Sequence, residues 1–147
     1  NRKYTCEILE NILGGNMSSR LFMELRENKG LVYNISSNIE LTSLGGYFII
    51  SCACKETNVN KAIDLIIKEL DKLKNTKISK NELKDSKTNL TNILILSSED
   101  NSDIAQFYGD TLAFDEKMIN FTEYINKIDN VTINDIYKLW FIKPAEI

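Results

Sequence analysis

The chain opens with apolar residues at helical spacing. They fall on one side of a helix that Gly14 and Gly15 can end: Cys6, Ile8, Leu9, Ile12 and Leu13. A second helix follows, with Ser18 or Ser19 as its cap and Gly30 as its C-terminal turn. Leu21, Phe22 and Leu25 form its apolar side. The pattern therefore predicts two helices in the first 30 residues.

From Leu31 the period of the apolar positions changes from about 3.6 to two, which is typical of a half-buried strand. Apolar and polar residues alternate as Leu31, Tyr33, Ile35, Ile39 and Leu41 against Asn34, Ser36, Asn38 and Glu40. Gly45 and Gly46 can reverse the chain into a second strand over 47–54. Its near-continuous apolar character predicts cover on both faces. We expect an antiparallel hairpin.

The rest of the chain reads as helices. An amphipathic helix begins near Thr57 and runs to Leu73. The capping signature [ST]-x-x-[DE] occurs three times and indicates at least three further helix starts. The three pairs are Ser79 with Glu82, Ser97 with Asp100, and Thr132 with Asp135. Because no repeat or low-complexity linker interrupts the pattern, residues 1–147 are predicted to be one α+β domain, an antiparallel sheet with helices packed on one face.

Charge and composition exclude several function classes. The chain carries 18 Lys+Arg against 21 Asp+Glu, and its bases concentrate in 55–87, which hold nine bases and six acids. No basic cluster suited to a phosphate backbone exists, so we expect no nucleic-acid partner. No apolar run approaches the roughly 20 residues of a membrane helix. The chain has no histidine, so it cannot be a His-triad hydrolase or a His-ligated zinc enzyme alone.

The three cysteines, Cys6, Cys52 and Cys54, lack a disulfide-framework spacing. They favour an intracellular, reducing compartment, either the cytoplasm or an organelle matrix. Together they could be imagined as a zinc site, but buried, inert thiols are the commoner outcome. Gly14 and Gly15 lack the Gly-Lys-Ser/Thr that follows in a phosphate-binding loop, so a helix stop is expected there.

Residues 12–33 carry the most specific signal, I-L-G-G-N-M-S-S-R-L-F-M-E-L-R-E-N-K-G-L-V-Y. This segment resembles the signature of the second structural domain in the pitrilysin and mitochondrial processing peptidase family, zinc peptidases with an inverted H-x-x-E-H motif. The family form is roughly L-G-G-G-M-S-S-R-L-F-x-x-L-R-x-x-x-G-L-x-Y, and Asn16 replaces its third glycine. The resemblance implies the fold of that domain, within a longer chain whose first and last strands are missing from 1–147.

The resemblance also implies roles for two residues. In that family one domain binds zinc, and a facing homologous domain supplies an arginine and a tyrosine seven residues apart, which match Arg26 and Tyr33 here. A guanidinium and a phenol O–H suit the oxyanion that develops when a peptide carbonyl is hydrolysed, and each such donor can be worth ~3 kcal/mol. The implied cofactor is zinc held by another domain, and the implied partners are that homologous domain and an extended peptide substrate.

Other interpretations of the same residues stay open. Tyr33 on the apolar side of a strand is commonly a core or rim aromatic. Arg26 near a helix C-terminus can simply favour the helix dipole. At the level of the whole domain, the alternatives are a non-catalytic substrate-binding or structural subunit of the same superfamily, and a structural domain that merely shares the helix-hairpin-helix pattern.

Overall fold

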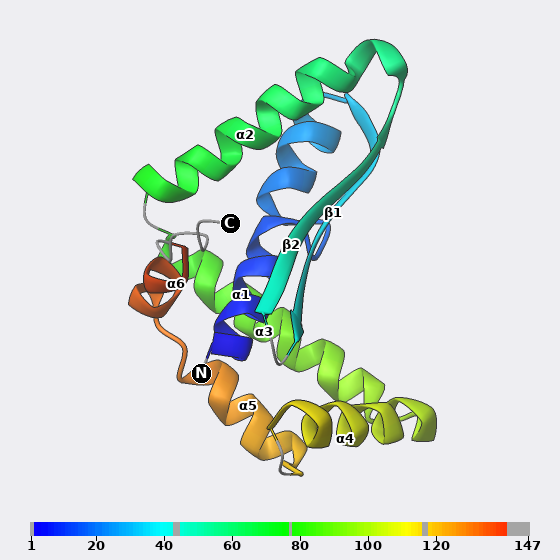
Figure 1. The fold of residues 1–147 in the computed structure, drawn as a ribbon, viewed down its shortest axis with the longest axis vertical. Coiled ribbons are helices and arrows are strands. Elements are labelled where there is room, and N and C mark those ends of the chain that lie inside the picture. The colour runs from blue at the N-terminus through cyan, green and yellow to red at the C-terminus, as the bar shows by residue number, and fades with distance from the viewer. Residues whose placement is uncertain (1, 43–44, 77, 116–117, 141–147) are drawn as a thin grey trace.

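The fold is described by a computed structural model that covers residues 2–42, 45–76, 78–115 and 118–140 (Figure 1). Its elements in chain order are α1 (Arg2–Leu13), the π-helix η1 (Phe22–Asn28), β1 (Val32–Thr42), β2 (Gly45–Cys54), the short 3-10 helix η2 (Glu56–Asn58), α2 (Val59–Asn75), α3 (Lys80–Ser97), α4 (Asn101–Asp115), α5 (Phe121–Asp129) and α6 (Ile133–Trp140). The predicted α+β class is confirmed. None of the described helices is long and apolar enough to cross a membrane.

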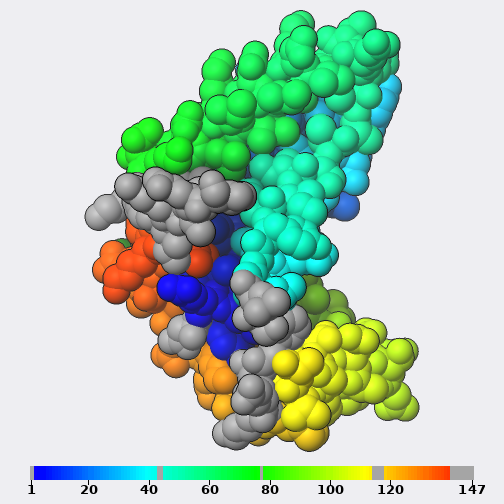
Figure 2. Space-filling view, viewed as in Figure 1, coloured from blue at the N-terminus to red at the C-terminus, as the bar shows by residue number. Residues whose placement is uncertain are grey.

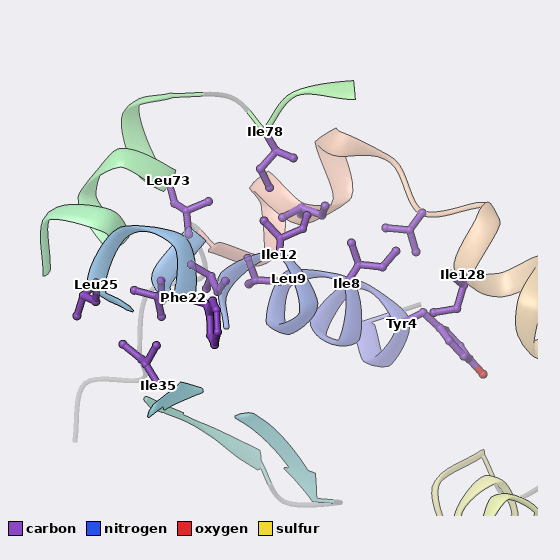
Figure 3. Close-up of a cluster of buried hydrophobic side chains, with 14 of the residues drawn as sticks. Tyr4, Ile8, Leu9, Ile12, Phe22, Leu25, Ile35, Leu73, Ile78 and Ile128 are labelled. Atoms are coloured by element: carbon purple, nitrogen blue, oxygen red, sulfur yellow. The ribbon is translucent and has the colours of Figure 1, made fainter. Parts of the chain in front are cut away.

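Helix α1 is the centre of the domain. Eight of its 12 residues are buried, and Ile8 and Leu13 are fully enclosed. It packs against β1, α3, α5 and α6, so that one helix joins the hairpin to the C-terminal helices. Figure 3 shows Leu9 near Phe22 of η1, Ile12 near Ile78, and Tyr4 near Ile128, within one buried cluster. The apolar side predicted from sequence is therefore the core.

The end of α1 lies unusually close to β1. A Cβ added at Gly14 would lie 2.5 Å from the backbone nitrogen of Ser37, so only glycine fits there. The hydroxyl of Ser37 donates to the Glu10 carbonyl at 3.0 Å, and the Ile39 N–H donates to the Glu10 carboxylate at 2.8 Å. Burial raises the pKa of Glu10, and the Ile39 hydrogen bond partly opposes that rise. Polar contacts thus fix how α1 meets the hairpin.

Strands β1 and β2 form the predicted antiparallel hairpin, paired from Val32 with Cys54 to Thr42 with Gly45. The prediction that Gly45 and Gly46 reverse the chain is wrong, because both glycines belong to β2 and pair with Thr42 and Leu41; residues 43–44 lie outside the described residues. The prediction that β2 is covered on both faces is wrong, because Tyr47 and Ile49 are exposed. Helix α1 packs against β1, and the sheet has two strands in the described structure, so β2 keeps an open flank.

The helix starts follow short side-chain signals. Ser79 and Glu82 form a full capping box at α3, with Glu82 N–H donating to Ser79 Oγ at 3.1 Å and Ser79 N–H to Glu82 Oε2 at 2.8 Å. Thr132 and Asp135 make the equivalent pair of bonds at α6. The box predicted at Ser97 is wrong: Ser97 ends α3, and Asp100 itself caps α4 by accepting from the N–H groups of the following helix.

Helix α2 confirms the predicted amphipathic helix but buries only part of its apolar surface. Ala62 and Leu73 are buried in the core cluster. Val59, Ile63 and Ile67, four residues apart along one side, are exposed. In Figure 2 this helix forms one end of the molecule, and α4 with the end of α3 lies at the opposite end.

Candidate functional site

The loop that leads into the site is organised by Asn16. Its side-chain oxygen accepts from the backbone N–H of Ser18 at 2.8 Å, and its amide donates to the side chain of Asn11 at 2.9 Å. The predicted side-chain cap by Ser18 or Ser19 is wrong, because the Ser19 hydroxyl donates to the Asn16 carbonyl at 2.6 Å instead of accepting from the helix. The residue that replaces the family's third glycine therefore stabilises this loop.

The helix that carries Arg26 is a π-helix, a rare winding that is frequent at functional sites. It ends at Gly30, whose φ of 60° lies in the left-handed region that favours glycine. The N–H of Gly30 donates to the Arg26 carbonyl at 3.0 Å, and the N–H of Leu31 donates to the Leu25 carbonyl at 2.9 Å. This pair of bonds is the C-cap expected of a glycine stop, and it turns the chain directly into β1.

The guanidinium of Arg26 rests on an aromatic ring. Its central carbon lies 4.8 Å from the centroid of the Phe22 ring, within the range of a cation–π contact, and Phe22 is itself buried in the core. Arg26 is exposed and forms no ion pair with a carboxylate among the described residues. Glu24 is instead engaged by Lys29 at 3.9 Å and by the Asn28 amide at 3.2 Å. The Phe22 ring thus supports the planar guanidinium of Arg26, and the N–H groups of the guanidinium stay available as donors.

Tyr33 is turned outward by a β-bulge. The register of the hairpin shifts between Val32 and Asn34, so Tyr33 is the extra residue of β1. The prediction that Tyr33 shares the apolar side with Ile35 is therefore wrong: Val32 and Ile35 are buried, and Tyr33 is 62% exposed. Its hydroxyl has no hydrogen-bond partner within the described part of the chain. A core role for this tyrosine is excluded.

Arg26 and Tyr33 are brought to the same end of the hairpin, because the Gly30 turn joins the end of η1 to the start of β1. Asn58 fixes this junction by donating its amide to the Leu31 carbonyl at 3.1 Å. No hydrogen bond joins the two side chains in the described structure. The arrangement offers two exposed donors on either side of the Gly30 turn, and such donors can bind a carbonyl or carboxylate oxygen.

Two parts of this arrangement were missed at the sequence level. Phe22 lies four residues before Arg26, a spacing that places side chains on the same side of a helix and could have indicated the ring contact. The bulge at Tyr33 has no signal in the sequence.

The cysteines do not build a metal centre. Cys6 is buried in α1, where burial, followed by Glu7 and Glu10, raises its pKa to about 11. Cys52 is exposed, so the expectation of buried thiols is wrong there, because β2 has an open flank. Among the described residues, no three Cys, Asp or Glu side chains come together as metal ligands.

Comparison with known proteins identifies the family of this chain. The family model described as "Peptidase M16 inactive domain" matches residues 1–90. The chain belongs to the M16 peptidase family. The uncharacterized zinc protease YmxG of Bacillus subtilis is 30% identical over 92% of the chain and 33% of its own length. The resemblance to pitrilysin-type zinc peptidases is confirmed, in the domain that does not bind zinc.

Two other M16 relatives match most of this chain but only about a third of their own length. The crystal structure of the peptidase M16 inactive domain from Pseudomonas fluorescens has a TM-score of 0.80 at 20% identity, over 92% of this chain and 32% of that one. The probable inactive metalloprotease YmfF of Bacillus subtilis is 24% identical over 90% of this chain and 30% of its own. This chain spans about a third of the length of the curated relatives it matches.

Proposed function

We propose that this M16 domain completes the active site of a zinc peptidase by presenting Arg26 and Tyr33 to the carbonyl oxygens of an extended peptide. The observation that carries the proposal is the exposure of both donors on one fixed turn. Arg26 is supported by Phe22 without a carboxylate partner in the described structure, and Tyr33 is turned out of the core by the bulge.

Hydrolysis of a peptide bond develops negative charge on the carbonyl oxygen. Donors already aimed at that oxygen lower the barrier, because they need little reorganisation when the charge appears. The guanidinium N–H groups and the phenol O–H can serve that oxygen or a neighbouring substrate carbonyl. The zinc belongs to a homologous domain outside residues 1–147, and the residues of this chain take part only as donors and as a substrate surface.

We infer that further strands extend the hairpin in the intact protein. Two-stranded sheets are marginal in water, and both β2 and the outer side of α2 expose apolar residues, including Ile49 and Ile63. Amide hydrogen exchange in the intact protein tests this inference. Protection of the β2 amides that do not face β1 would support it, and rapid exchange of those amides would contradict it.

The test of the main proposal is kcat/KM for a quenched, unstructured peptide, measured on the intact peptidase assembly. Arg26→Ala should lower kcat/KM at least tenfold, and Arg26→Lys should recover only part of it, since a lysine keeps the charge without the planar fork. Arg2→Ala is the matched control, because Arg2 is also exposed. Equal activity of the Arg26→Ala and Arg2→Ala proteins would contradict the proposal.

A second candidate function is a non-catalytic member of the family that binds peptides or partners without cleaving them. It is favoured by the relative described as a probable inactive metalloprotease. In that case the intact protein would bind the peptide in a chelator-insensitive way, with no cleavage, and Arg26→Ala would weaken binding alone.

A further inference from the structure

A second concave surface lies between α3 and α5 and shares no residue with the Arg26 and Tyr33 site. This α3–α5 groove has a volume of about 470 Å³, within the range of ligand sites. Its lining consists of Lys80, Leu83, Lys84, Lys87, Thr88, Thr91 and Asn92 of α3, with Ile125 and Asp129 of α5. Three of its residues are cationic and one is acidic, in a chain whose net charge is −3.

The three lysines are repelling neighbours on one side of α3. Lys84 lies four residues after Lys80 and three before Lys87, and like charges at these spacings destabilise a helix. Lys80 and Lys84 have no ion-pair partner among the described residues. Glu82, between them in sequence, is held by Arg20 at 2.6 Å. Asp129 is the one acidic residue of the lining, so the groove keeps a net positive charge.

The C-terminal part of helix α2 shows a contrasting arrangement. Its Lys72 pairs with Glu69, and its Lys74 lies 3.5 Å from Asp71. Lysines that serve only solubility can be mixed with acids in this way. In the α3–α5 groove, Lys87 is instead fixed by donating to the Asp129 backbone carbonyl at 2.6 Å, which leaves its positive charge in the groove.

The shape of the groove selects the kind of anion. Lys80 and Lys87 are seven residues apart, which is about 10 Å along a helix axis. Lys80 and Lys84 are about 6 Å apart on the same measure, close to the roughly 7 Å between alternate side chains of an extended peptide. Leu83 and Ile125 add an apolar floor, and Thr88, Thr91 and Asn92 add hydroxyl and amide groups. A single phosphate would use neither the length nor the apolar floor.

We propose that the α3–α5 groove binds an extended acidic segment of polypeptide in which carboxylates alternate with apolar side chains. The carboxylates meet Lys80, Lys84 and Lys87, and the apolar side chains lie on Leu83 and Ile125. Because the groove is separate from the Arg26 and Tyr33 site, this binding does not depend on peptidase activity.

The experiment is fluorescence anisotropy of the intact protein with a labelled hexapeptide of alternating glutamate and leucine, at two salt concentrations. We expect saturable binding that weakens as salt rises, and no binding of the peptide with glutamine in place of glutamate. The double variant Lys80→Gln, Lys84→Gln should weaken binding at least tenfold. The matched control is Lys61→Gln, Lys68→Gln, which removes two exposed lysines of α2 and should change the dissociation constant less than twofold.

Several results would overturn the proposal. They are absence of saturable binding, equal loss in the two double variants, and displacement of the peptide by inorganic phosphate at an equal concentration. Lysine-dependent binding to vesicles containing phosphatidylserine, without binding of the peptide, would assign the groove to a membrane surface and would also overturn it. Thermal melts of both double variants verify that each is folded.

Discussion

The segment from α1 to β1 and the segment formed by the end of α3 with α4 differ sharply in how they pack. Helix α1 buries eight of its 12 residues, whereas Thr111 is the only buried side chain among those described in α4. Ile95 and Leu96 at the end of α3 and Leu112 of α4 are exposed. In Figure 2 this second segment forms an end of the molecule.

This difference shows which part of the domain fixes the candidate site. Arg26 lies in η1 and Tyr33 lies in β1, two elements whose core residues are enclosed. The positions of both side chains therefore depend on the densely packed segment from α1 to β1. The family model matches residues 1–90, which contain that whole segment. The end of α3 and α4 contribute none of the contacts described around Arg26 and Tyr33.

The largest expected effect comes from cutting a core side chain in the packed segment. Leu25 is fully enclosed, so Leu25→Ala should lower the free energy of unfolding by about 2–5 kcal/mol. Leu96→Ala, at a leucine that is 67% exposed, should lower it by less than about 1 kcal/mol. Denaturant unfolding measures both values. Similar losses in the two variants would mean that α3 is packed as tightly as η1.

Replacing two glycines by alanine is expected to change the stability of the protein in opposite directions. A Cβ at Gly14 would collide with backbone atoms of β1, so Gly14→Ala should cost about 1–3 kcal/mol. Gly109 lies within α4 and has open space around it, so Gly109→Ala should add about 0.5–1 kcal/mol of stability. Thermal melts of the two variants would show midpoints on opposite sides of the parent protein. A loss of stability in the Gly109 variant would contradict the loose packing of α4.

A smaller effect is expected at the ion pair between Arg20 and Glu82, which ties the packed segment to α3. Burial raises the pKa of Glu82, but the hydrogen bonds from Arg20 and Ser79 outweigh it and the net shift is downward. Stability from this pair is therefore present above the unfolded pKa of a glutamate, about 4.3, and is lost as pH falls through the lower folded value.

Arg20→Ala should accordingly cost about 1 kcal/mol at pH 7 and less at pH 3, because the contribution of the pair declines once the pH falls below the unfolded pKa of a glutamate, about 4.3. Unfolding by denaturant at the two pH values measures the difference. A loss that is equal at both pH values would mean that Arg20 acts through packing and not through its charge.

Local patterns in the sequence predicted much of this fold. The apolar side of α1, the hairpin, the α2 helix and the capping boxes at Ser79 and Thr132 each depend on residues a few positions apart. Such signals survive into the structure because tertiary contacts reinforce them. The same holds for Gly30, whose left-handed conformation ends η1 as its position predicted.

The features that escaped prediction depend on distant contacts. The bulge at Tyr33 is set by the pairing of β1 with β2 and by burial of Val32 and Ile35 against the helices. The exposure of Cys52 depends on what covers the open flank of β2. The pattern of Ser97 with Asp100 predicted a helix start at Ser97, but α3 continues to Ser97 and Asp100 caps α4 instead.

The most direct test of the account compares the kcat/KM values of two tyrosine variants in the intact peptidase assembly. Tyr33 and Tyr47 are both exposed and both lie on the hairpin, but only Tyr33 is assigned to the substrate carbonyl. We predict that Tyr33→Phe lowers kcat/KM at least tenfold and that Tyr47→Phe changes it less than twofold, with both proteins equally stable. Full activity of the Tyr33→Phe protein would contradict the assignment of this domain's donors to the reaction.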